Sequence, residues 1–179
     1  MFGLRFRLFI VGAVVTAGFL VGASPASAHS DSSPQKITFT TTVTSTERVL
    51  YYAGVNNSIT YGWNRLIGTA TIDGVLSDIE LLANVDYKDN GGPFYGFITI
   101  TQPDATLALR MNGKAVPFTH RESYSSAPET KFKSKLKVLG GSGRFIEARG
   151  AGAWTGERTT ELGGAVSMRV VLKVSGISD

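Results

Sequence analysis

Apolar and polar residues alternate with period two along almost the whole chain after residue 35. Ile37, Phe39 and Val43 share one face of their segment, and threonines fill the other face. The segments 105–111 and 165–176 repeat this alternation. Successive side chains of a strand point to opposite faces of a sheet, so the pattern predicts strands that each bury one face.

Short turn motifs separate the alternating segments, among them Asp73-Gly74, Asn112-Gly113 and Gly140-Gly141-Ser142-Gly143. Motifs of this kind join antiparallel strands into hairpins. The sequence predicts strands near residues 36–45, 48–54, 65–72, 75–87, 94–102, 105–111, 131–139, 144–159 and 165–176. So many strands in one small domain form a sandwich or a barrel, and closure into a barrel removes exposed strand edges. We therefore predict an all-β fold: a single antiparallel β-barrel of eight strands, with a ninth left open.

The start of the chain differs from the rest. Arg5 and Arg7 precede an apolar, almost uncharged run over residues 8–23, and Ala26-Ser27-Ala28 has the small residues that a signal peptidase reads. The alternative, a retained membrane anchor, needs about 18 or more apolar residues. The run ends earlier, at Ser24-Pro25, which favours a cleaved signal peptide.

Cleavage after Ala28 divides the chain into a signal peptide, residues 1–28, and a single barrel domain, residues 29–179, with an ordered core at about 36–177. The expected location is extracellular or in the cell envelope, with no stable membrane insertion after cleavage. The chain has no cysteine, which excludes thiolate catalysis and cysteine-bound zinc or iron–sulfur sites. A domain of this size can be held by its core alone.

The basic isoelectric point, 9.4, overstates the positive charge of the mature chain. Without Arg5 and Arg7, 16 Lys and Arg remain against 14 Asp and Glu, a net charge near +2. The clearest basic cluster places a lysine at every second residue of segment 131–137. That spacing is typical of the solvated face of a strand, so we predict no nucleic-acid partner.

The glycines of Gly140-Gly141-Ser142-Gly143 resemble a phosphate-binding loop at first sight. A Walker loop needs GxxxxGK[ST] and a following helix, and a dinucleotide fingerprint would need a glycine at Ile146. Neither pattern is present. The glycines instead predict a tight turn with positive φ that leads into a long strand. In that strand Gly150, Gly152 and Gly156 share a face with Trp154, where missing side chains permit coiling or leave room for a ligand.

Gly140-Gly141-Ser142-Gly143-Arg144-Phe145, followed by Ala148-Arg149-Gly150, is similar to a signature of the allene oxide cyclase and dirigent proteins. The close match covers about eleven residues. The resemblance implies a calycin-like eight-stranded antiparallel barrel with an apolar cavity open at one end. Proteins of this family act mainly by confining a hydrophobic substrate. It also implies a role for Arg149, which matches the arginine of the motif, whereas the acidic partner that dirigent proteins use has no match by motif.

Two residues of this segment are the candidate catalytic pair. Glu147 and Arg149 lie two apart, so both point the same way and can form an ion pair or polarise a ligand together. A solvated surface pair is the alternative. The candidate ligand-binding residues are Arg149, Trp154, Tyr95, Phe97 and Tyr52; the last lies beside the predicted rim loop 54–64, and a second rim loop is predicted at 118–130. For the aromatic residues the alternative is a place in the core or at the rim.

The two histidines raise a metal hypothesis. After cleavage His29 becomes the N-terminal residue, whose amine and imidazole can chelate copper together with His120. No further copper-site motif is visible, so we predict no metal site and no cofactor.

Two functions remain open. The first is a secreted barrel that binds a small hydrophobic or aromatic molecule in its cavity and guides its cyclisation or coupling without a cofactor. The second is a non-catalytic extracellular or envelope module, packed solid, whose loops bind a macromolecule. The volume of the interior discriminates them: a ligand-binding barrel needs about 300 Å³ or more, whereas a structural barrel is packed like any core. The sequence determines neither the ligand nor the oligomeric state.

Overall fold

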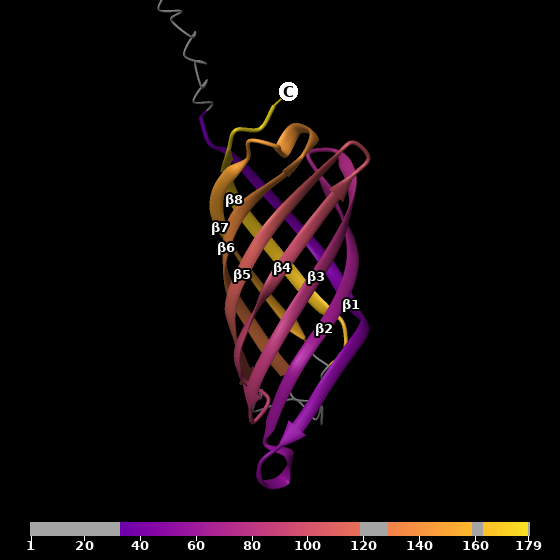
Figure 1. Cartoon of the computed structure of the whole chain (residues 1–179), viewed down its shortest axis with the longest axis vertical. Coiled ribbons are helices and arrows are strands. Elements are labelled where there is room, and N and C mark those ends of the chain that lie inside the picture. Colours follow the sequence, from indigo (N-terminus) through magenta and orange to yellow (C-terminus); the bar gives the residue numbers. More distant parts are fainter. Residues whose placement is uncertain (1–32, 119–128, 159–162, 179) are drawn as a thin grey trace, which may run out of the picture.

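The alternating segments form strands in the computed structural model, which describes residues 33–118, 129–158 and 163–178. Within these residues there are eight strands and two short 3-10 helices (Figure 1). The strands are β1 (Gln35–Ala53), β2 (Ile59–Ile72), β3 (Val75–Lys88), β4 (Gly92–Gln102), β5 (Ala105–Phe118), β6 (Glu129–Ser142), β7 (Arg149–Arg158) and β8 (Val166–Ser175). The helices are η1 (Val55–Asn57) and η2 (Gly143–Phe145). None of the helices so described is long and apolar enough to cross a membrane.

Each strand pairs antiparallel with the next along the chain, and β8 pairs with β1, which closes the barrel. The prediction of an all-β, eight-stranded antiparallel barrel is confirmed. Closure leaves no row of unpaired backbone groups along an edge, and the strands cross the barrel at a slant (Figure 1).

A ninth strand is absent from the described barrel because segments predicted separately, 36–45 and 48–54, form one strand. The first part of β1 pairs with β8 as far as Val43, and the second part pairs with β2 from Thr44 onward. A register shift between Ser45 and Glu47 lies close to this change of partner. The sequence pattern breaks at such an irregularity, although the backbone continues through it.

Other predicted boundaries are wrong as well. The turn predicted at Asn112-Gly113 lies inside β5, which continues to Phe118. The segment 144–159 forms a strand only from Arg149, because the chain after β6 first turns through η2. The rim loop predicted at 54–64 is shorter, since β2 already begins at Ile59. The second predicted rim loop, 118–130, lies mostly outside the described residues, as does the predicted signal peptide 1–28.

The inward-facing side chains fill the barrel. Along β8, Val166, Met168, Val170, Leu172 and Val174 are all buried, and the residues between them face outward. The other strands repeat this alternation, so one apolar cluster occupies the interior. A few polar side chains are also buried, and several of them gather toward one end of the barrel, near Trp154.

Candidate functional site

A small cavity of about 50 Å³ lies in the barrel interior beside the buried polar residues. Seven of the eight strands, all except β5, contribute to its lining. Most of the lining residues are aliphatic or aromatic, and a few carry polar groups. The residues are Val43, Asn64, Leu66, Leu81, Ala83, Val85, Tyr87, Phe94, Phe132, Trp154, Arg158 and Val166.

Three aromatic rings form one wall of this cavity. The ring centroids of Phe94 and Phe132 are 5.9 Å apart with an edge-to-face angle of 71°, and Phe94 and Trp154 are 5.4 Å apart. Phe132 and Trp154 complete the cluster at 5.9 Å. Trp154 is only 3% exposed, and its indole N–H has no acceptor among the described residues. A buried donor of this kind costs free energy unless a ligand or a water accepts its hydrogen bond.

Arg158 places a cationic group in the same cavity. Its side chain is buried, its Nη2 donates to Oγ1 of Thr130 over 3.2 Å, and its guanidinium lies 5.6 Å from the Phe132 ring centroid. Burial lowers the pKa of Arg158, and the nearby Tyr87 acts in the opposite direction. The shift leaves an arginine charged at neutral pH, so the cavity holds a guanidinium in low-dielectric surroundings.

Tyr87 adds a third donor. Burial raises the pKa of its phenol to about 12, partly offset by the charge of Arg158. The phenol is therefore protonated at neutral pH and can donate a hydrogen bond. Asn64 also lines the cavity, and its Oδ1 accepts from Oγ of Ser45 over 2.6 Å. The cavity thus offers donors from Trp154, Arg158 and Tyr87, a set that can hold an acceptor or an anion and stabilise negative charge on it.

Alkaline pH is expected to destabilise the fold through Tyr87. An unfolded tyrosine ionises near pH 10, whereas Tyr87 in the fold keeps its proton up to about pH 12. Between these values the unfolded state binds fewer protons, so the free energy of unfolding falls, by on the order of 3 kcal/mol in total. Urea unfolding at pH 9 and pH 11.5 measures the loss, and Tyr87→Phe should remove this part of it. Identical losses in the two proteins would contradict the assignment.

The predicted catalytic pair lies on the outer wall. The side chains of Glu147 and Arg149 are 65% and 63% exposed, and Arg149 Nη2 lies 3.9 Å from Glu147 Oε2. They do face the same way, as their spacing predicts, but away from the interior where Ala148 is buried. The placement is that of a solvated surface pair, so Arg149 does not line the cavity; a catalytic or ligand-binding role for either residue stays a prediction.

Of the aromatic candidates, Trp154 alone lines the cavity. Tyr95 and Phe97 project outward from β4, being 47% and 44% exposed, and Tyr52 at the end of β1 is 58% exposed. The intervening Phe94 is the β4 residue that faces inward to the cavity. Both faces of β4 carry aromatic residues, so period-two alternation alone does not show which face is inside.

Sequence reasoning missed Arg158, Tyr87 and Asn64 as site residues. Arg158 has the even spacing of Trp154 and the strand glycines, which the sequence analysis placed on one face. Tyr87 likewise follows the apolar alternation of β3. The sequence indicated both residues, because alternation places these polar side chains on the buried face. A polar side chain there requires a hydrogen-bonding partner inside the barrel.

The metal hypothesis is not addressed by the structure, because His29 and His120 lie outside the described residues. Among the residues that are described, no group of three or more His, Asp or Glu side chains is placed to hold a metal ion.

Comparisons with known proteins found little at the level of sequence: no family model and no curated protein matches this chain. A solved structure that it resembles is that of the pterocarpan synthase dirigent protein PsPTS1. The identity is 11%, the TM-score is 0.49, and the match covers 83% of this chain and 99% of the other. Since the likeness is this distant, the case for function rests on the site itself.

Proposed function

We propose that this protein binds a small aromatic molecule through a hydrogen-bond acceptor group that enters the barrel interior at Trp154 and Arg158. One observation supports this most directly. The indole N–H of Trp154 is buried without a described acceptor in a cavity that also buries a guanidinium. A barrel that served only as a packed scaffold would gain stability from apolar residues at these two positions.

The size of the cavity limits what enters it. About 50 Å³ is room for a few water molecules, far less than the volume of an aromatic ligand pocket. The described cavity therefore accommodates only a carboxylate, carbonyl or hydroxyl group of the ligand. The rest of the ligand lies outside this cavity. In this proposal, guidance of cyclisation or coupling comes from holding the reacting group and stabilising negative charge on it, without a cofactor.

Titration with 4-hydroxybenzoate tests the proposal, because this probe carries two acceptor groups on one ring. Calorimetry should detect its binding, and toluene, which lacks an acceptor, should bind much more weakly. Trp154→Phe keeps an aromatic ring but removes the indole N–H, and we expect it to weaken binding about 10-fold or more. The chain has a second tryptophan, Trp63, on the outer wall. Trp63→Phe is therefore the matched control, with unchanged affinity expected.

Wild-type affinity in Trp154→Phe, or no binding of 4-hydroxybenzoate by the wild type, would overturn this proposal. Those results would favour the second function, a packed extracellular or envelope module. The observation that supports this alternative is the small interior, well below the roughly 300 Å³ of an ordinary ligand pocket. The secreted or envelope location is itself part of both proposals, and N-terminal sequencing of exported protein tests it.

A further inference from the structure

Positive charge is concentrated on one half of the outer wall. Besides Lys131, eight exposed cationic side chains project outward from β5, β6, β8 and the first part of β1; we call these eight the basic wall. They are Lys36, Arg110, Lys114, Lys133, Lys135, Lys137, Arg169 and Lys173. None of the eight forms an ion pair with another described residue. A net charge of only about +2 therefore conceals a strongly segregated surface.

The opposite half of the wall is built differently. Its one arginine at the centre, Arg65 on β2, is bound by two carboxylates, Glu47 and Glu80. Asp78 and Asp86 also project outward from β3 there. Arg65 is thus neutralised within the fold, whereas the cations of the basic wall are not.

The strand register brings like charges of the basic wall directly opposite one another. Arg110 pairs with Lys137, and Lys114 pairs with Lys133, across β5 and β6. Like charges at directly opposed positions destabilise a sheet. Along β6 itself, successive lysines are about 7 Å apart, because they occupy every second residue. An anion bound to this wall would relieve the repulsion, which a solvated strand face alone leaves in place.

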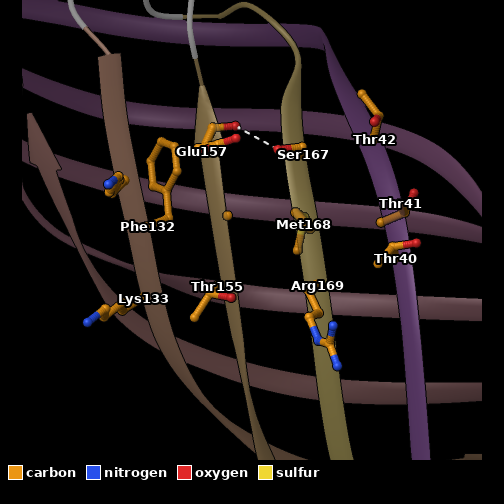
Figure 2. A pocket seen from close by; sticks show the side chains of 12 residues that line it. Thr40, Thr41, Thr42, Phe132, Lys133, Thr155, Glu157, Ser167, Met168 and Arg169 are labelled. Atoms are coloured by element: carbon orange, nitrogen blue, oxygen red, sulfur yellow. Dashed lines mark hydrogen bonds between the residues drawn. The ribbon is translucent and has the colours of Figure 1, made fainter. Parts of the chain in front are cut away.

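Three open grooves follow the row of lysines. One of about 670 Å³ and one of about 590 Å³ share Lys133, and the second shares Lys135 with a third of about 410 Å³. Small side chains of β7, Ala153 and Thr155, lie beside the lysines. Figure 2 shows the largest groove, where β6, β7, β8 and β1 run side by side. The grooves adjoin, so the wall offers a continuous path rather than one point for an anion.

The other groups in the largest groove indicate which polyanion fits. Thr42, Thr155 and Ser167 supply hydroxyl groups, and Glu157 supplies a carboxylate among the cations (Figure 2). A carboxylate repels closely spaced phosphates but accepts hydrogen bonds from sugar hydroxyls. No aromatic side chain projects outward from the described parts of β6, β7 and β8, so the largest groove lacks the stacking platform that single-stranded nucleic acids use. Tyr95 of β4 lines only the third groove.

We propose that the basic wall binds a linear acidic polysaccharide. Its carboxylate or sulfate groups lie against the lysines of β6 and the flanking arginines, and its hydroxyls contact the threonines, Ser167 and Glu157. This proposal is independent of the interior site, because no residue of the basic wall lines the interior cavity.

Binding to polygalacturonate, with neutral dextran as the negative control, tests the proposal. The wild type should bind polygalacturonate, and the affinity should fall about 10-fold or more between 50 and 200 mM salt. Lys133→Gln and Lys135→Gln should each weaken binding about 3-fold, and the double variant about 10-fold. Lys88→Gln removes the same charge from the exposed end of β3 and should leave the affinity unchanged.

A steric variant separates seating in the grooves from simple charge attraction. Ala153→Ile keeps the charge and suits a strand, but it narrows the path beside Lys133 and Lys135, so we expect about 3-fold weaker binding. The proposal is overturned if polygalacturonate fails to bind, or if Ala153→Ile binds it like the wild type. Equal or tighter binding of duplex DNA or of phosphatidylglycerol vesicles would overturn it as well, because the basic wall would then bind any polyanion through charge alone.

Discussion

Replacing Trp154 with alanine is expected to lower the free energy of unfolding by about 3–5 kcal/mol. The indole is 3% exposed and packs against both Phe94 and Phe132. Removing it leaves a cavity that the stiff barrel strands cannot close, and two rings lose their contacts. Urea unfolding with a fixed m-value measures the change.

Trp63 provides the comparison for this substitution. It lies on the outer wall and is 36% exposed, so Trp63→Ala should cost about 1 kcal/mol or less. Trp154→Phe keeps most of the ring contacts and should be much less damaging than Trp154→Ala. Equal losses for the two alanine variants would show that the aromatic cluster does not support the core as described.

Gly143→Ala is expected to cost about 3 kcal/mol or more, the second largest effect. Gly143 has a φ of 54°, and a Cβ at this position would overlap the carbonyl oxygen of Asp104 and lie 3.0 Å from Cβ of Ala105. The strained φ alone costs about 1–2 kcal/mol for an alanine. Overlap with backbone atoms adds to it, because they belong to the neighbouring hairpin and cannot rotate away.

Gly74 separates the two contributions. Its φ is 81°, also positive, yet nothing lies within 4 Å of the position where a Cβ would stand. Gly74→Ala should therefore lower the free energy of unfolding only through its positive φ, by about 1 kcal/mol. Melting curves of both variants measure the difference. Equal melting temperatures for Gly143→Ala and Gly74→Ala would refute the overlap argument.

The turn around Gly143 illustrates what local sequence can predict. Its glycines predict positive φ, and Gly140 and Gly143 both have it. The prediction that the turn leads directly into a strand is nevertheless wrong, since η2 begins at Gly143 and β7 begins only at Arg149. Where a strand begins depends on pairing with a partner, here β6 and β8, and local preference does not report that pairing.

The site shows the same limit. Trp154 was predicted as a ligand-binding residue and does line the cavity, while Tyr95, Phe97, Tyr52 and Arg149 face outward. The spacing of the lysines of β6 predicts a solvated face, and they are indeed exposed. Spacing within one strand does not show that Lys133 stands opposite Lys114, since that contact joins two strands through their register.

The sequence by itself determined the fold class, because period-two alternation is a local property that each segment carries alone. Only the tertiary structure decided which face of each strand is inside and which side chains meet. Arg158 and Tyr87 come from strands far apart in the chain, and closure of the barrel places them in one cavity. The basic wall likewise arises from the order of the strands around the barrel, which sums charges that the sequence scatters over more than 130 residues, from Lys36 to Lys173.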